Sequence, residues 1–384
     1  MSAAEVGSNP EWRLLELVSI ADPGSAAFGE AVEVAASVVD PDELLAQAAR
    51  HALLPALADF LAEAGLLSLM PHQTQKAVLG ALHWNRLKTT AFCAEAIRVT
   101  DGLAARGITV ATTKGVASHA LLYDDRGTRH FGDIDLMVLP EQRHEVAAAL
   151  TELGYAGGKS FDNRTGELVD LPRSVTAMYR LYPDHLPHFL RLAPESAVPY
   201  HMVDIAFSLT WYGTAWQVPM DDALATIQRN PVGFGEPGAT VPALTTPYSF
   251  LFVVLHLFRE GWFARVINEK DARLSQFADV WRFWNRLARA QAAEIIAIMA
   301  SSGIAPAVAW VCHHVDQLYG SSMVSELELG AYCDPQWLCS ASSPDGSLQS
   351  WHGQFRRRLR ERGAPKLVPA HEAPFAVEAQ VQRR

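Results

Sequence analysis

The segment from Asp133 to Val138 (DIDLMV) constrains the fold of this chain more than any other. Two acids separated by one apolar residue open a run of strand character. Because residues i and i+2 of a strand point to the same side, Asp133 and Asp135 are expected to project together, with the intervening apolar residues buried opposite. Two carboxylates on one face repel each other unless a cation neutralises them, and Mg²⁺ takes carboxylate and phosphate oxygens together. The segment therefore predicts a metal site for phosphoryl or nucleotidyl transfer.

The residues around this segment predict alternating strands and helices. The β-branched run ITVATT precedes a Lys114-Gly115 turn, and Pro140 is a good first residue for the helix that Gly154 ends. The expected elements are a strand over 108–113, a helix over 116–123, a strand over 133–139 and a helix over 141–153. This alternation is typical of an α/β core.

Helical patterns flank that core. Residues 11–105 show apolar residues at spacings of three and four, with an Asp40-Pro41 start signal and a long helix expected from Pro71 to Ala105. Strands are expected over 175–182 and 199–207, and helices return over 246–320. We predict an α+β fold, a small mixed-sheet core flanked by helical regions. The predicted regions are 1–105 (N-terminal helical), 106–210 (α/β core), 211–340 (C-terminal helical) and 341–384 (irregular segment and mobile tail).

The overall composition limits the classes of binding partner and the cellular compartment that we expect. The 384 residues carry a formal net charge of -10, which disfavours nucleic acid as a partner without excluding a local basic groove. The four cysteines form neither a disulfide framework nor a CxxC zinc motif. The N-terminus shows no signal-peptide pattern, and the longest apolar stretch, 248–258, is too short to span a bilayer. A soluble cytoplasmic protein with no membrane partner is expected.

The combined motifs resemble the nucleotidyltransferase superfamily that includes DNA polymerase β, and more closely its uncharacterised bacterial branch. The matching residues are Thr113-Lys114-Gly115, Leu122-Tyr123, Arg129, Asp133-Ile134-Asp135-Leu136, Leu139-Pro140-Glu141 and Leu153-Gly154-Tyr155. A looser match follows around His256, Trp262 and Asp279. Val116 stands where the superfamily usually has Ser or Gly, so Ser118 is the hydroxyl proposed for phosphate binding.

The resemblance implies a third carboxylate on a nearby strand, and Asp204 in the apolar run HMVDIA is our candidate. Asp133, Asp135 and Asp204 would then be both the metal ligands and the catalytic residues, holding two Mg²⁺ ions on a nucleoside triphosphate. Lys114, Gly115, Ser118 and Arg129 would bind the nucleotide.

Structural explanations stay open beside each role. Asp204 could pair with Arg180 or Arg191, Arg129 could pair with Asp124 or Asp125, and Lys114 could be a solvated turn residue. His256 is expected to be a hydrogen-bonded core residue, and His201 to point away from Asp204. Trp211 and Tyr212 are the aromatic residues best placed to stack on a base or substrate.

These observations predict a Mg²⁺-dependent nucleotidyltransferase acting on a small molecule, or on a peptide or protein, with release of pyrophosphate. One alternative is an aminoglycoside-type enzyme, which needs an acidic pocket from candidates such as Asp184, Glu195 and Asp221-Asp222. Another is a tRNA-directed enzyme using the basic run Arg356-Arg357-Arg358-Leu359-Arg360. The last is a non-catalytic nucleotide-binding module.

Overall fold

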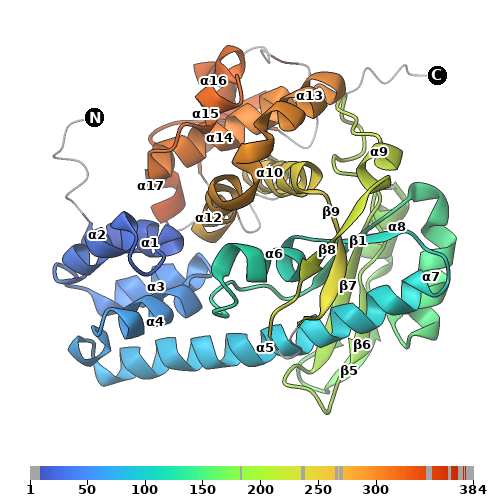
Figure 1. Cartoon of the computed structure of the whole chain (residues 1–384), viewed down its shortest axis with the longest axis horizontal. Helices are drawn as coiled ribbons and strands as arrows, with labels where there is room; N and C mark the ends of the chain where they lie inside the picture. Colours follow the sequence, from blue (N-terminus) through green and yellow to red (C-terminus); the bar gives the residue numbers. More distant parts are fainter. Residues whose placement is uncertain are drawn as a thin grey trace.

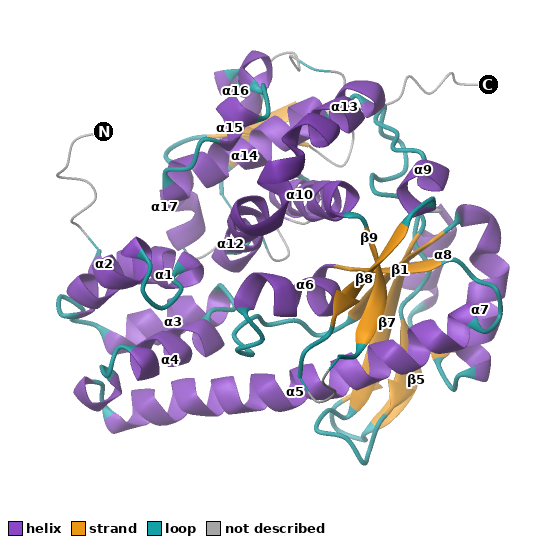
Figure 2. Cartoon of the chain, viewed as in Figure 1, coloured by secondary structure: helices purple, strands orange, loops and turns teal. Residues whose placement is uncertain are grey.

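The computed structural model describes residues 9–181, 184–234, 238–263, 267, 271–342, 348–361, 365–370, 375 and 377, with the backbone alone at 178, 180 and 181. A sheet of seven strands lies on one side of the molecule and helices fill the other (Figure 2). The predicted α+β class is therefore confirmed.

The sheet is mixed, with the order β3-β6-β7-β2-β1-β9-β8. Its strands are β1 (Val110–Thr113), β2 (Ile134–Val138), β3 (Ala156–Gly157), β6 (Phe189–Leu192), β7 (Tyr200–Ala206), β8 (Ile227–Pro231) and β9 (Thr240–Leu244). β2 runs parallel to β7 and β1 runs parallel to β9, whereas the other neighbours are antiparallel. The two acid-bearing strands are thus direct neighbours at the centre of the sheet.

Alternation along β2 has the predicted effect. Ile134, Leu136 and Val138 are buried together in one apolar core with residues of β7 and of helix α5 (His72–Ala104). Met137 belongs to a second core on the other side of the sheet, built mostly from the flanking helices. Asp135 lies two residues before Met137, so it projects toward the same face of the sheet, opposite to the face that packs against α5.

The N-terminal helices are α1 (Pro10–Ile20), α2 (Ala26–Ala35), α3 (Pro41–Arg50), α4 (Leu54–Glu63) and α5. The side chain of Asp40 accepts hydrogen bonds from the N–H groups of Asp42 and Glu43, so the predicted Asp40-Pro41 start is confirmed. The long α5 extends from this group of helices to the sheet (Figure 1).

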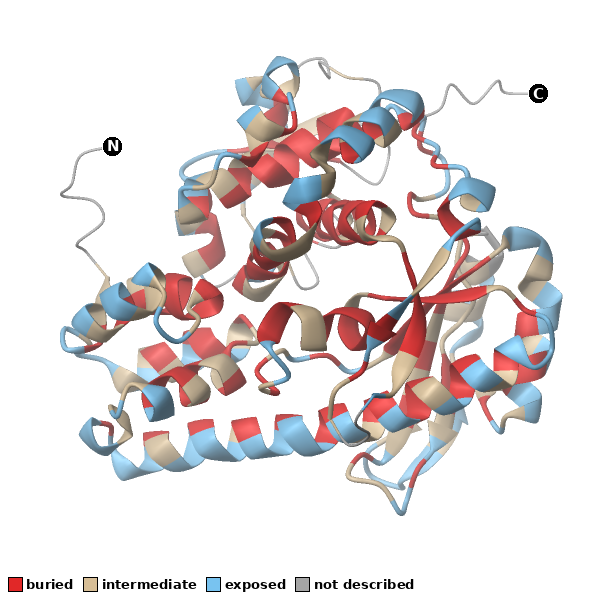
Figure 3. Cartoon of the chain, viewed as in Figure 1, coloured by how far each residue is buried: buried red, intermediate tan, exposed pale blue. Residues whose placement is uncertain are grey.

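The remaining helices connect the strands or cover the sheet. They are α6 (Lys114–Tyr123), α7 (Arg143–Glu152), α8 (Arg173–Leu181), α9 (Met220–Leu224), α10 (Thr246–Trp262), α12 (Leu274–Phe283), α13 (Ala292–Ser302), α14 (Ala305–Tyr319), α15 (Met323–Glu326), α16 (Pro335–Leu338) and α17 (Phe355–Arg360). α10 and α14 are red along much of their length in Figure 3, so their side chains form the centre of the helical region.

Three predictions of secondary structure are wrong. Residues 173–181 form helix α8 rather than a strand, although Val, Thr and Tyr favour strands locally. β8 and β9 lie in the region predicted to be helical, and they widen the central sheet. Part of the predicted irregular segment instead forms a three-stranded antiparallel sheet of β10 (Ser340–Ser342), β11 (Leu348–Trp351) and β12 (Leu367–Pro369). A further pair, β4 (Lys159–Asp162) and β5 (Glu167–Asp170), forms a separate hairpin.

Candidate active site

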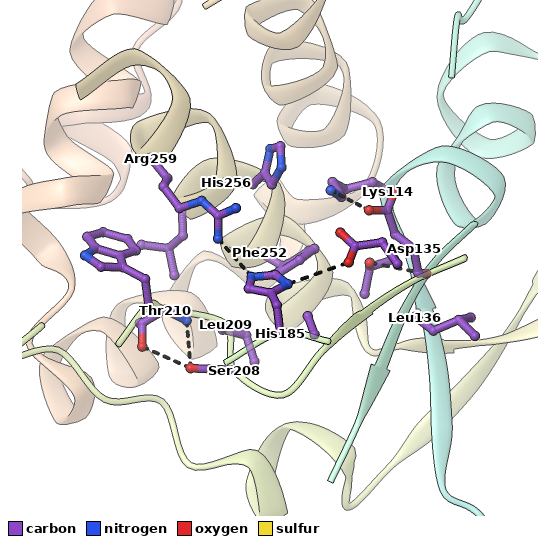
Figure 4. A pocket seen from close by; sticks show the side chains of 15 residues that line it. Lys114, Asp135, Leu136, His185, Ser208, Leu209, Thr210, Phe252, His256 and Arg259 are labelled. Atoms are coloured by element: carbon purple, nitrogen blue, oxygen red, sulfur yellow. Dashed lines mark hydrogen bonds and ion pairs between the residues drawn. The ribbon is translucent and has the colours of Figure 1, made fainter. Parts of the chain in front are cut away.

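A pocket lies where β1, β2 and β7 meet one face of α10 (Figure 4). Its charged and titratable lining residues are Lys114, Asp135, His185, Asp204, His256 and Arg259. The pocket therefore brings together two of the three predicted carboxylates and the predicted lysine. It also contains three groups for which no catalytic role was predicted.

Asp135 and Asp204 face each other because of the strand register. In the parallel β2–β7 pair Asp135 is the partner of Asp204, and in the antiparallel β1–β2 pair Asp135 is the partner of Thr113. The next residue, Lys114, opens α6 with φ 45, a left-handed conformation that is uncommon outside glycine. Its Nζ lies 2.6 Å from Oδ1 of Asp135. The turn predicted at Lys114 thus delivers an ammonium group to the carboxylates.

Like charges are crowded around Asp135. Burial and the negative charges of Asp133 and Asp204 raise its pKa to about 7, although Lys114 opposes the shift. Burial works to lower the pKa of Lys114, but the three carboxylates together raise it above its ordinary value. One ammonium group is therefore the counterion of several carboxylates, and an additional cation would stabilise the site.

Asp204 has a different environment from Asp135. Its Oδ1 lies 3.7 Å from Nδ1 of His185 and 3.8 Å from Nε2 of His188, and although this oxygen is buried it has no hydrogen-bond partner among the described residues. Burial works to raise the pKa of Asp204, but His185, His188 and Lys114 hold it well below its ordinary value. Asp204 is therefore an ionised carboxylate with an oxygen available to a cation or a proton.

His185 is fixed by a second contact. Nη1 of Arg259 lies 2.9 Å from Nε2 of His185, and a guanidinium group can only donate. Nε2 of His185 faces this donor, and Nδ1 faces Asp204. His185 therefore lies between Arg259 and Asp204 and approaches each of them with one ring nitrogen.

The helical wall of the pocket comes from one face of α10. Phe252, Leu255, His256 and Arg259 recur at helical spacing and all line the pocket. The ring of Phe252 lies under Lys114, with Nζ 5.5 Å from the ring centroid. His256 was predicted to be a core residue, but its side chain retains 22% exposure and borders the pocket.

Asp133 precedes β2 and approaches a further lysine that the sequence analysis did not select. Burial lowers the pKa of Lys88 to about 8, while the charge of Asp133 opposes this shift. Nζ of Lys88 also lies 3.4 Å from both ring nitrogens of His130. Lys88 lies on α5, far from the motif in sequence, so no local pattern pointed to it.

Arg129 makes a structural ion pair rather than facing the pocket. Its Nη2 lies 2.8 Å from Oδ2 of Asp279, whose Oδ1 also accepts a 2.6 Å hydrogen bond from Tyr123. The predicted partners Asp124 and Asp125 are wrong, because Asp124 pairs with Arg286 and Asp125 accepts from the N–H of Phe234. Within the described part of the chain, Nη1 of Arg129 has no hydrogen-bond partner.

The other two predicted nucleotide-binding residues lie on α6. Gly115 packs so tightly that a Cβ atom there would lie 3.2 Å from the ring of Phe131. Ser118 is buried and does not line the pocket. The packing explains why glycine follows Lys114.

The structure can be compared with the alternative partners expected for Asp204 and with the positions expected for His201, Trp211 and Tyr212. Arg191 pairs with Glu95 and not with Asp204, while the side chain of Arg180 lies outside the described part of the chain. His201 packs edge-on against Phe92, away from the pocket as predicted. Trp211 lines the pocket, whereas Tyr212 is exposed and does not.

The features expected for other acceptors lie elsewhere. None of Asp184, Glu195, Asp221 and Asp222 lines the pocket. In the C-terminal basic run, Arg356 bonds Glu16, Arg357 bonds Glu361 and Arg358 bonds Asp271. Much of the positive charge in that run is therefore already paired within the chain.

Comparison with known families agrees with the arrangement of the pocket. The model of a family described as "uncharacterised nucleotidyltransferase" matches residues 37–320, which include the whole pocket. The chain belongs to this family. A comparison with curated proteins gives no significant match. Over the described residues, no helix is both long enough and apolar enough to cross a membrane.

The carboxylates of this nucleotidyltransferase family member fit a hard divalent cation. Three acids interact electrostatically, and the buried Oδ1 of Asp204 lacks a hydrogen bond. Among the described side chains, however, no group of three or more His, Cys, Asp or Glu residues is placed to hold a metal ion. Lys114 is instead the cation bonded to Asp135. The donor chemistry suits magnesium, with Lys114 occupying one oxygen that a metal would share.

Proposed function

We propose that this protein is a Mg²⁺-dependent nucleotidyltransferase that moves a nucleoside monophosphate from a nucleoside triphosphate to a hydroxyl or phosphate group and releases pyrophosphate. One observation carries the proposal: Asp135 and Asp204 are register partners on adjacent parallel strands, and both line one pocket together with Lys114. The family match supports nucleotidyl transfer as the class of reaction.

Each acid would have a distinct role. Oδ1 of Asp204 accepts no hydrogen bond from the described residues, so we assign it the proton of the attacking hydroxyl. Asp133, Asp135 and Asp204 would hold the magnesium, which would neutralise the triphosphate and acidify the acceptor hydroxyl. Asp135 has its pKa raised to about 7 by burial and by its acidic neighbours, so added positive charge would favour its ionised form.

The positive groups would act on the phosphates. Lys114 is bonded to Asp135 without substrate, and an arriving triphosphate offers it stronger oxygen partners. The N–H groups at the start of α6 lie directly after Lys114 and suit a phosphate oxygen. Together they would hold the leaving pyrophosphate in line with the attacking oxygen.

The test uses water as the default acceptor. Wild type is incubated with Mg²⁺ and each nucleoside triphosphate, and the products are separated. Attack at the α-phosphorus gives a nucleoside monophosphate and pyrophosphate, and Asp204→Asn should remove this slow reaction. Arg229→Gln, on the exposed side of β8, is the control that keeps it. Release of nucleoside diphosphate and inorganic phosphate would instead contradict nucleotidyl transfer. Nucleotide binding without any turnover would favour the non-catalytic module.

A further inference from the structure

Arg259 is a pocket cation that no carboxylate pairs with among the described residues. Its one hydrogen bond there runs from Nη1 to Nε2 of His185, at 2.9 Å. Figure 4 shows Arg259 reaching from α10 to His185, while Lys114 and Asp135 lie beyond that imidazole. Arginine keeps its charge under all ordinary conditions and suits planar or tetrahedral oxyanions. Because this contact uses one guanidinium nitrogen, Arg259 has other donors left for an anionic ligand.

Hydroxyl groups accompany the guanidinium. The loop after β7 places Ser208, Thr210 and Trp211 in the pocket lining with Arg259. Oγ of Ser208 lies 3.1 Å from Oγ1 of Thr210 and accepts from the N–H of Thr210, so the two side chains are held together. A guanidinium group and hydroxyls that line the same pocket can together bind an extended anionic ligand, with the charge-assisted bonds made by the guanidinium.

The position of Asp204 assigns this end of the pocket. If Asp204 takes the proton of the acceptor, the acceptor must approach on the side of Asp204 that faces away from Lys114. His185 contacts Asp204 with one ring nitrogen and Arg259 with the other, so Arg259 lies on that side. The triphosphate would lie at the opposite end, against Lys114 and the start of α6.

We propose that Arg259, with Ser208 and Thr210, forms an acceptor subsite that selects an anionic substrate, one with a carboxylate or phosphate near the reacting group. The inference rests on the proposed function, because that function defines the acceptor side. It opposes a polycationic acceptor, since the basic end of the pocket would repel one. His185 is the positioning residue that orients Arg259.

The experiment measures oxyanion binding separately from nucleotide binding. The protein is saturated with Mg²⁺ and the α,β-methylene analogue of the nucleoside triphosphate it binds, which blocks transfer. Inorganic phosphate is then titrated in by calorimetry, and lactate in a parallel series, to separate phosphate from carboxylate recognition. The variants are Arg259→Gln and Arg259→Lys, with Arg229→Gln as the control, and thermal unfolding shows that each is folded.

We expect Arg259→Gln to weaken binding of the preferred anion by at least about tenfold, the size of a lost charge-assisted hydrogen bond. Affinity for the analogue should not change, and Arg259→Lys should weaken the anion less than Arg259→Gln. The proposal is overturned if neither anion binds wild type, or if Arg259→Gln binds both anions as tightly as wild type does. It is also overturned if the affinity of Arg259→Gln for the analogue falls together with its affinity for the anion. Failure of the analogue to bind wild type would count against the proposed function instead, and the anions titrated into the free protein would still test Arg259.

Discussion

Two buried charge clusters in this chain show how similar burial can serve different ends. In the pocket, the side chains of Lys114 and Asp135 are 15% and 9% exposed, and those of Arg129 and Asp279 are 12% and 11% exposed. Asp279 accepts hydrogen bonds from both Arg129 and Tyr123. Asp135 instead has its pKa raised by burial and by two acidic neighbours. Crowded like charge, rather than burial, distinguishes the pocket.

The difference has a physical reason. A buried ion pair that is balanced stabilises the fold mainly in the sense that breaking it is costly. A buried group of acids opposes folding until a cation arrives, and such groups are concentrated at functional sites. The Arg129 cluster therefore ties α6 and α12 together, while the Asp135 cluster keeps a demand for charge that a ligand can meet.

The largest expected effect comes from breaking the ion pair between Arg129 and Asp279. Asp279→Ala should lower the free energy of unfolding by about 3–5 kcal/mol, because it leaves the Arg129 guanidinium buried without its acid. Denaturant unfolding measures the loss. The double variant Arg129→Met/Asp279→Leu is the control and should recover most of it. A loss below about 1 kcal/mol for the single variant would show that the pair is not structural.

The second prediction uses pH on the crowded cluster without metal. The folded pKa of Asp135 is about 7, above its ordinary value of 3.8. The folded state therefore holds an extra proton between these values, and this contribution to stability is lost as pH rises toward 7. Unfolding free energy of wild type minus that of Asp135→Asn should fall by up to about 1.4 kcal/mol per pH unit between about pH 5 and 7.

Asp204 provides the contrast for this measurement. Its pKa is lowered, so its contribution is present at neutral pH and is lost only as pH falls through the ordinary carboxyl range. The difference between wild type and Asp204→Asn should therefore be flat over the same interval. A difference for Asp135 that rises with pH would mean that Lys114 outweighs the acidic neighbours.

The third and smallest effect concerns Lys114. Removing its charge with Lys114→Met should weaken Mg²⁺-dependent nucleotide binding by about tenfold, or about 1.4 kcal/mol, because one phosphate partner is lost. Lys76→Met, an exposed lysine on α5, is the matched control. Equal nucleotide affinities of Lys114→Met and Lys76→Met would contradict a nucleotide-binding role for Lys114 and leave it a role in folding alone.

Local pattern was sufficient for the parts of the site that lie on one element. The alternation in β2, the turn at Lys114 and the strand character around Asp204 are properties of short segments, and the structure contains each of them. The register that makes Asp135 and Asp204 partners is a long-range property that the sequence did not predict. Asp204 was selected because the resemblance implies a third carboxylate and because an unpaired acid in an apolar run is costly to bury.

The remaining parts depend on tertiary contacts. His185 lies in a loop and Arg259 on a helix, and only the packing of α10 over the sheet brings them together. Arg129 looked functional because it sits near the motif, but its acid, Asp279, comes from α12. β8 and β9 were missed because each contains proline, Pro231 and Pro242, which weakens the strand signal in the sequence.

The central claim is that the crowded acids bind a nucleotide through magnesium. Its most direct test is calorimetric titration of ATP, GTP, CTP and UTP, with and without Mg²⁺, into wild type, Asp135→Asn/Asp204→Asn and Asp279→Asn. We predict that wild type binds at least one nucleotide in a Mg²⁺-dependent manner and that the double variant does not. The folded fraction of Asp279→Asn should bind that nucleotide as wild type does. Nucleotide binding that is indifferent to both Mg²⁺ and the double substitution would contradict the claim.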